Sequence, residues 1–255
     1  MAPRVGIVII CTNCYFLLGM RFVKKFNHFY KGNYSITYCI FTDTDPTPYL
    51  KGIKNFKYFE TSHDTWNSAT NSKFRNILKL KTVKTPFDYV YYFDADTDIN
   101  KSFDNWFIGD TVAGQHFSSN TMLLNDDLHY ERNPESLAFI PKESPLTKTY
   151  FLGAFFGCKT PIIYELCKLL NNNLVKDEAN NINARWQDES YLNHYFHYNP
   201  PSLLILFKDF PFVTSCKGGL QDTRDTKRKI DDQKRKLLLN PESLFNIVKG
   251  EIVFT

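Results

Sequence analysis

The sequence predicts a single α/β domain in which a mostly parallel sheet is covered by helices on both faces. Short runs such as VGIVIIC at 5–11 and YVYYF at 89–93 are apolar on both faces, which is typical of buried parallel strands. Longer segments between the runs carry apolar residues at helical spacing, so that strands and helices alternate along the chain. The 255 residues suffice for a substantial core, and neither an internal repeat nor a domain boundary stands out.

The individual elements follow from these patterns and from turn residues between them. Strands are expected at 5–11, 34–42, 56–60, 90–93, 111–116, 150–157, 203–207 and 252–254. Helices are expected at 16–30, 68–83 and 160–171, with a fourth inside 179–196 that has Asp188 and Glu189 near its middle. Most of 109–145 reads as long loops, which in a compact domain are usually functional.

Composition excludes several classes of protein. A net charge of +4 suits phosphate-bearing small molecules better than nucleic acid, which needs a concentrated basic face. The six cysteines are scattered without a zinc-ligand pattern and are expected to be buried thiols of a reducing compartment. No apolar run approaches the ~20 residues of a membrane span, and no signal peptide is evident. We therefore expect a cytoplasmic protein without a nucleic-acid partner; its oligomeric state is not predicted.

A run of acidic residues follows the strand at 90–93. Asp94 and Asp96, separated only by Ala95, stand where that strand leaves the sheet, which is where open α/β sheets bind ligands. Two carboxylates at this spacing can converge on a hard cation such as Mg²⁺ or Mn²⁺, whose open positions take substrate phosphates. The alternative is an acidic turn without further function. The nearby Asp98 is expected to be a surface residue.

Four charged residues have a functional and a structural interpretation. Asp188 and Glu189 lie in WQDESYLN, whose apolar residues indicate partial burial; they either face a sugar or metal, or belong to a solvated helix face. Lys217 and Arg224 follow a Gly-Gly turn, where they either bind a diphosphate or are plain surface charge.

Three ring side chains have the same two interpretations. His116 and His129 flank loop segments and either donate hydrogen bonds to a polyhydroxylated ligand or are ordinary loop residues. Tyr15, just after the first strand, either stacks on a base or packs in the core.

Several of these segments together resemble one family. The strings that carry the resemblance are IFTD at 40–43, DAD at 94–96, YERNPESLAFIPK at 130–142, YFLGAFFG at 150–157 and WQDESYLNHYF at 186–196. In this order they resemble glycosyltransferase family 6, the retaining α-1,3-galactosyl and N-acetylgalactosaminyl transferases. The resemblance implies a GT-A fold over residues 1–225, with a nucleotide-binding half at about 1–100 and an acceptor-binding half at about 101–225. The charged extension at 226–255 has no counterpart and no assigned role.

The resemblance also implies roles for particular residues. Asp94 and Asp96 would bind Mn²⁺, with Mg²⁺ as the alternative, and Glu189 would be the nucleophile or the stabiliser of an oxocarbenium-like transition state. Contacts to the donor nucleotide sugar are implied for Ile10, Thr12, Tyr15, Lys73, Asp94, Ala95, Asp96, Leu152, Gly153, Ala154, Asp188, Lys217 and Arg224. Contacts to the acceptor are implied for His116, His129, Trp186 and Glu189.

The chain also departs from the family pattern. Gln187 replaces a usual His, and the segment Leu152-Gly153-Ala154 mixes features of galactose and N-acetylgalactosamine enzymes. The basic helix residue near the metal is placed at Lys73, with Arg75 as the alternative. The region 203–213 is much shorter than in the mammalian enzymes, so the acceptor is expected to differ.

The function implied is that of a hexosyltransferase. It would move galactose or N-acetylgalactosamine from a UDP-sugar donor to the 3-hydroxyl of a galactose-terminated glycan acceptor, with α-linkage. Retention of configuration leaves two routes open, a covalent Glu189 intermediate and a same-face internal return. The alternative functions are a non-catalytic sugar- or nucleotide-binding module derived from a transferase, and a GT-A transferase with another donor such as UDP-glucose.

Overall fold

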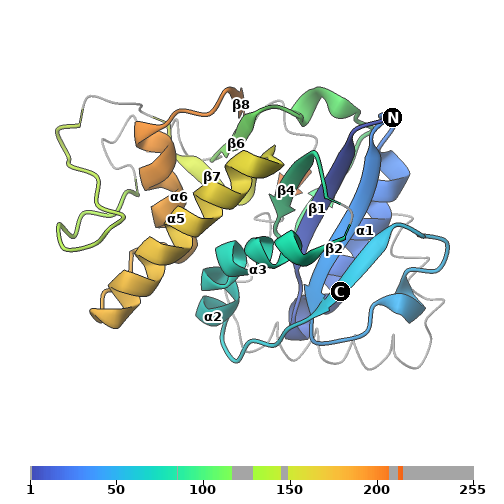
Figure 1. Cartoon of the computed structure of the whole chain (residues 1–255), viewed down its shortest axis with the longest axis horizontal. Coiled ribbons are helices and arrows are strands. Elements are labelled where there is room, and N and C mark those ends of the chain that lie inside the picture. The colour runs from blue at the N-terminus through green and yellow to red at the C-terminus, as the bar shows by residue number, and fades with distance from the viewer. Residues whose placement is uncertain (1, 85, 117–128, 145–148, 207–211, 215–255) are drawn as a thin grey trace, which may run out of the picture.

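The computed structural model describes residues 2–84, 86–116, 129–144, 149–206 and 212–214. Within them a seven-stranded sheet runs in the order β3-β2-β1-β4-β7-β6-β8, with helices packed against it (Figure 1). Its strands are β1 (Arg4–Ile10), β2 (Ser35–Thr42), β3 (Phe56–Glu60), β4 (Tyr89–Phe93), β6 (Thr111–Gln115), β7 (Phe151–Lys159) and β8 (Leu203–Ile205). The helices are α1 (Phe16–Phe29), α2 (Trp66–Asn71), α3 (Lys73–Lys79), α5 (Thr160–Ala179) and α6 (Gln187–Tyr198).

The sheet is mostly parallel, as the sequence predicts. β1 pairs in parallel with β2 and β4, β2 with β3, and β6 with β8. The exception is β7, which runs antiparallel to both of its neighbours, β4 and β6. Because of this reversed direction, Phe155 in the middle of β7 lies beside Phe93 at the end of β4, and the preceding Ala154 accepts a hydrogen bond from the Asp94 N–H. The two segments together build the site described below.

Each face of the sheet has its own core. Alternation along β1 sends Val5, Ile7 and Ile9 into one cluster and Val8 and Ile10 into the other. The first cluster contains the apolar side of α1. The second contains apolar residues of α3, α5 and α6. The predicted covering of both faces is thereby confirmed.

A small second sheet joins β5 (Thr97–Ile99) to β9 (Phe212–Thr214). Asp98 of β5 is not a surface residue as predicted, because its side chain is half-buried and paired with two cations of α1. Lys25 Nζ lies 2.7 Å from Asp98 Oδ1, and Arg21 lies 3.1 Å from Oδ2. Asp98 therefore holds β5 against α1.

The single helix predicted at 68–83 is wrong, since the segment forms α2, α3 and a short 3₁₀ turn. α2 begins early because Thr65 and Ser68 form a capping box, in which each side chain accepts a hydrogen bond from the other's backbone N–H. It ends at Ser72, whose hydroxyl donates to the Ala69 carbonyl at 2.7 Å. Such side-chain bonds compete with the helical backbone, and the helix axis restarts at Lys73.

Two further helix boundaries differ from the prediction. α5 does not end at 171 but continues through three asparagines to Ala179, because Leu174 and Asp177 keep a buried face in contact with the core. Tertiary packing outweighs the weak helix propensity of asparagine there. α6 begins only at Gln187, which has a left-handed φ of 44°. Asp188 and Glu189 consequently lie in the first turn of α6 rather than near the middle of a helix.

None of the described helices is both long and apolar enough to cross a membrane. The longest of them, α5, has 20 residues but carries charged side chains along its length.

Candidate active site

The site forms where β4 ends, β7 begins and α6 starts. Asp94 directly follows β4, and its backbone N–H donates to the Ala154 carbonyl of β7 at 2.9 Å. One residue earlier in β7, the Gly153 N–H donates to Glu189 Oε2 at 2.7 Å. The strand reversal of β7 thus brings the acidic turn and the first turn of α6 together around Gly153.

A buried lysine joins these segments. Lys73, at the start of α3, is 3% exposed, and its ammonium donates to Asp188 Oδ2 at 2.5 Å. The same nitrogen donates to the Gly153 carbonyl at 2.9 Å and lies 3.6 Å from Asp94 Oδ1. Arg75 is exposed. The structure therefore places Lys73, and not the alternative Arg75, beside the carboxylates.

The charges of this cluster compensate one another. Burial alone would lower the pKa of Lys73, but the nearby charges of Asp188 and Asp94 raise it above its ordinary value. Burial raises the pKa of Asp188 to about 6, while Lys73 opposes the shift. At neutral pH the buried pair therefore consists of an ammonium and a carboxylate, the arrangement in which a buried charge is tolerated.

Glu189 has a different environment. Burial raises its pKa to about 7, and hydrogen bonds from the Gly153 N–H and the Tyr150 hydroxyl oppose the shift. Its carboxylate is packed closely on Gly153, where an added Cβ would lie 2.9 Å from Glu189 Oε2. A half-buried carboxylate that titrates near neutrality is poised to act as a base, a nucleophile or a stabiliser of positive charge.

Asp94 and Asp96 supply the oxygen ligands that Mn²⁺ or Mg²⁺ prefers. The Tyr92 hydroxyl donates to Oδ1 of the Asp94 carboxylate and the Lys73 ammonium lies 3.6 Å from the same oxygen, whereas no hydrogen bond within the described residues falls on Oδ2. No group of three or more His, Cys, Asp or Glu side chains among those residues is arranged to hold a metal. The two aspartates fit a cation whose other ligands are diphosphate oxygens and water.

The residues predicted to contact the nucleotide lie beyond the end of β1. Ile10 ends that strand and is buried, and Thr12 Oγ1 lies 3.2 Å from His63 Nδ1. Tyr15 is partly buried, and its pKa is raised to about 12 by burial together with the charges of Asp96 and Asp94. The charges of Asp94 and Asp96 therefore act on the Tyr15 hydroxyl, as expected for a residue that lines the same site.

The residues predicted to contact the acceptor form an aromatic cluster around Tyr150. The Tyr150 ring lies 5.4 Å from the His116 ring and 6.2 Å from the His129 ring, and both contacts are edge-to-face. The His129 ring lies 5.6 Å from the ring of Trp186, which is 42% exposed. Burial, with a smaller effect of His129, lowers the pKa of His116 to about 4, so that this histidine is neutral.

The remaining predicted residues are placed as follows. Gly153 faces Glu189, whereas Leu152 and Ala154 belong to the core cluster on the α1 side of the sheet. Lys217 and Arg224 lie outside the described residues, so that their predicted role stays a prediction.

A comparison with protein families identifies the chain. The sequence profile of glycosyltransferase family 6 matches residues 2–211. The chain belongs to glycosyltransferase family 6. Its mostly parallel α/β sheet agrees with the GT-A fold that the family membership implies.

Relatives of this family 6 chain come from animals and bacteria. Globoside alpha-1,3-N-acetylgalactosaminyltransferase 1 of Gallus gallus is 28% identical over 208 residues, which is 79% of this chain and 60% of the relative. Histo-blood group ABO system transferase 2 of Rattus norvegicus is 23% identical over 206 residues, 79% of this chain and 61% of the relative. The O-antigen biosynthesis glycosyltransferase WbnI of Escherichia coli is 26% identical over 212 residues, 81% of this chain and 88% of the relative. The matches thus span only about three fifths of these animal relatives.

Two strings of the family resemblance have a structural role that the sequence did not reveal. Within YERNPESLAFIPK, Ser136 Oγ and the Leu137 N–H donate to the buried carboxylate of Asp177, at 2.7 and 2.9 Å. Within WQDESYLN, Asn193 is fully buried, accepts from the Phe151 N–H and donates to the Phe151 carbonyl, both at 2.8 Å. Its amide also donates to the Glu189 carbonyl at 2.9 Å, so that Asn193 holds α6 against β7.

Tyr92 was also missed, although the alternation of β4 contains the signal. Tyr92 and Asp94 are two residues apart and therefore share a face of the strand. Its hydroxyl donates to Asp94 Oδ1 at 2.7 Å.

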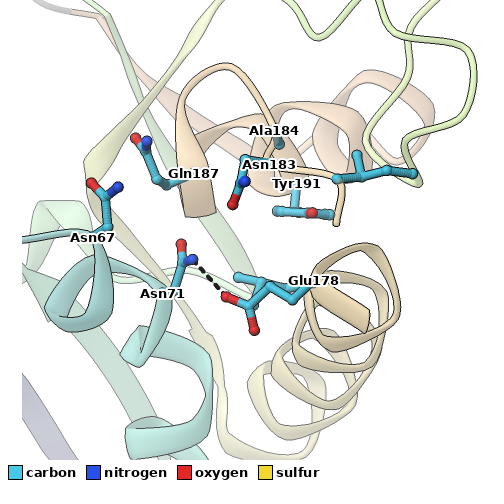
Figure 2. A pocket seen from close by; sticks show the side chains of 9 residues that line it. Asn67, Asn71, Glu178, Asn183, Ala184, Gln187 and Tyr191 are labelled. Atoms are coloured by element: carbon cyan, nitrogen blue, oxygen red, sulfur yellow. Dashed lines mark hydrogen bonds between the residues drawn. The ribbon is translucent and has the colours of Figure 1, made fainter. Parts of the chain in front are cut away.

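A small polar pocket lies beside the start of α6 (Figure 2). It is lined by Asn67, Asn71, Leu174, Glu178, Ile182, Asn183, Ala184, Gln187 and Tyr191. Asn71 of α2 points toward α5 and donates to Glu178 Oε1 at 2.9 Å, as Figure 2 shows. None of the predicted site residues lines this pocket, so it is distinct from the cluster around Gly153.

Proposed function

We propose that this chain is a retaining hexosyltransferase that moves galactose or N-acetylgalactosamine from a UDP-sugar to the 3-hydroxyl of a galactose-terminated glycan. The observation that supports it most is the half-buried Glu189 carboxylate, held by the Gly153 N–H on β7 beside Asp94 at the end of β4. In this arrangement the Glu189 carboxylate is available to the donor sugar, and the carboxylates of Asp94 and Asp96 are available to a cation on the diphosphate. The animal relatives are named as an N-acetylgalactosaminyltransferase and a blood-group transferase, and these names support the same reaction class.

We assign Glu189 to the anomeric carbon of the donor sugar. As the bond to UDP breaks, positive charge develops at that carbon, and a carboxylate on the opposite face of the ring stabilises it. The acceptor hydroxyl then forms the new bond on the face that UDP leaves. Both the covalent route through Glu189 and the internal return satisfy retention.

We assign the diphosphate to Asp94, Asp96 and Lys73. A cation held by the two aspartates, Mn²⁺ or alternatively Mg²⁺, would neutralise charge on the departing UDP. Lys73 is paired with Asp188 and lies 3.6 Å from Asp94 Oδ1, so that its ammonium offsets part of the negative charge gathered there. Tyr15 would stack on the base, and Lys217 and Arg224 would bind the diphosphate.

The division into halves is part of this proposal. The end of β1 and the turn after β4 would bind the nucleotide, within about residues 1–100. The aromatic cluster of His116, His129 and Trp186 would bind the acceptor, within about residues 101–225. Residues 226–255 receive no role.

A donor screen tests the function. The full chain is incubated with UDP-galactose, UDP-N-acetylgalactosamine or UDP-glucose, with lactose or fucosylated lactose as acceptor, and with Mn²⁺ or EDTA. UDP release is measured. We expect release from UDP-galactose or UDP-N-acetylgalactosamine that the acceptor stimulates and EDTA abolishes.

Two results would contradict the proposal. Release from no donor, with any acceptor or with water, would indicate a non-catalytic binding module, and release from UDP-glucose alone would indicate another donor class. In the reactions with Mn²⁺, the variant Asp94→Asn is compared with the control variant Asp98→Asn. Only the first should lose the Mn²⁺ stimulation, because the Asp98 carboxylate is paired with Arg21 and Lys25.

A further inference from the structure

We propose that Tyr92 is a positioning residue for Asp94, and that its hydroxyl determines which oxygen of the Asp94 carboxylate faces the metal. The inference rests on the metal-binding role proposed above for Asp94. It assigns to Tyr92 a function beyond packing in the core.

The contacts of the Asp94 carboxylate are one-sided. The Tyr92 hydroxyl donates to Oδ1 at 2.7 Å, and the Lys73 ammonium lies 3.6 Å from the same oxygen. No hydrogen bond from the described part of the chain falls on Oδ2. A carboxylate held through one oxygen has a defined orientation and presents the other oxygen to a ligand.

Tyr92 is itself held in place. Its side chain is 3% exposed, and its ring stacks on the cross-strand partner Phe156 with centroids 5.6 Å apart. Lys73 Nζ lies 4.4 Å from the centroid of the same ring, within reach of a cation–π interaction. These contacts fix the position of the Tyr92 hydroxyl. Lys73 contacts both the Tyr92 ring and the Asp94 carboxylate, which the hydroxyl orients.

A bound metal depends on such outer partners. A hydrogen bond that orients a metal-binding carboxylate orders that carboxylate before the cation binds. Loss of such a hydrogen-bond partner typically lowers metal affinity ~10–100-fold. Without the hydroxyl, Asp94 Oδ1 would retain only the more distant Lys73. The carboxylate would then turn toward the ammonium, and its alignment for the metal would be lost.

The test compares Tyr92→Phe with Tyr91→Phe. Tyr92→Phe keeps the stacked ring and removes only the hydroxyl. Tyr91 is the neighbouring buried tyrosine on the opposite face of β4, and its hydroxyl accepts from the Gly109 N–H at 2.8 Å, away from the carboxylates. Binding of Mn²⁺ to the full chain in the presence of saturating UDP is measured by the electron paramagnetic resonance signal of free Mn²⁺. Binding of UDP in EDTA is measured by calorimetry.

We expect Tyr92→Phe to weaken Mn²⁺ binding ~10–100-fold, with UDP binding in EDTA unchanged, and Tyr91→Phe to retain the wild-type Mn²⁺ affinity. A folded Tyr92→Phe with wild-type Mn²⁺ affinity overturns the inference, and so does an equal loss in both variants. If Tyr92→Phe does not fold, Tyr92→Met takes its place with the same expectation. Wild-type protein that binds no Mn²⁺ in the presence of UDP contradicts the proposed metal role itself, which is a separate outcome.

Discussion

At the scale of single residues, Glu189 is unusual because its half-buried carboxylate forms no ion pair with the described part of the chain. The Lys73 ammonium, whose charge acts on Glu189, is hydrogen-bonded to Asp188 instead. Glu189 relies on the Gly153 N–H and the Tyr150 hydroxyl, which favour the carboxylate form but do not cancel the cost of burial. A carboxylate in such surroundings responds strongly to positive charge that develops next to it.

Glu189→Gln tests this assignment through activity. We expect transfer to fall at least ~10²-fold while UDP binding stays nearly intact, because the amide cannot stabilise the transition state as a carboxylate does. In the wild type, kcat/KM should fall as pH drops below about 7, where Glu189 becomes protonated. Unchanged turnover in Glu189→Gln would refute the assignment.

The same substitution has a stability signature. Because the folded pKa of about 7 lies above the ordinary 4.5, folding favours the protonated form. The wild type should therefore lose stability relative to Glu189→Gln as pH rises from about 4.5 to about 7, by up to ~3 kcal/mol. Thermal and urea unfolding across this range measure the difference, and a difference that does not change with pH would contradict the buried charge.

At the scale of elements, the site depends on how α6 meets β7. The Asn193 amide bonds both backbone groups of Phe151, and Gly153 leaves room for the Glu189 side chain two residues further along the strand. The absence of a side chain at Gly153 is thus a packing requirement of the site. A glycine inside a strand often marks a close approach, and the group that approaches here is the Glu189 side chain.

Gly153→Ala tests that requirement. Its Cβ would lie 2.9 Å from Glu189 Oε2 and 3.0 Å from Glu189 Cβ, so the carboxylate has to shift. We expect transfer to fall ~10²-fold, with destabilisation of ~1–3 kcal/mol. Gly109→Ala is the control, since its Cβ would lie 3.1 Å from a methyl group of Val112 and 3.5 Å from Leu203 Cβ, away from the carboxylates. A folded Gly153→Ala with the wild-type transfer rate would contradict the packing argument.

The strands of the seven-stranded sheet were predictable, whereas the two strands of the small sheet, β5 and β9, and the helix ends were not. Runs such as those of β1, β2 and β4 are apolar on both faces and have one interpretation, because only a covered sheet buries them. The ends of α2, α5 and α6 depend on a capping box at Thr65, on burial of Leu174 and on a left-handed residue at Gln187. These are contacts and conformations that a one-dimensional pattern does not contain.

At the scale of the whole molecule, the predicted site residues come from segments far apart in the chain. Five segments contribute to the site. They are the end of β1, the start of α3, the turn after β4, the first residues of β7 and the first turn of α6. The resemblance to the family placed Lys73, Asp94 and Glu189 in one site before any geometry was known. Tyr92 was missed because only the shared face of the strand identifies Asp94 as its partner. Asn193 was missed because its partner, Phe151, lies 42 residues away in the sequence.

The stereochemistry of the product tests the central claim most directly. The sugar that the donor screen identifies is transferred from its UDP-α-linked donor to lactose, and the purified product is examined by proton NMR. We predict a new anomeric proton with the small coupling of an α-linkage, and a shift of the galactose 3-position that marks the attachment site. A β-linked product would contradict the retaining mechanism around Glu189, and an absence of product with every donor would contradict the claim that the chain is a transferase.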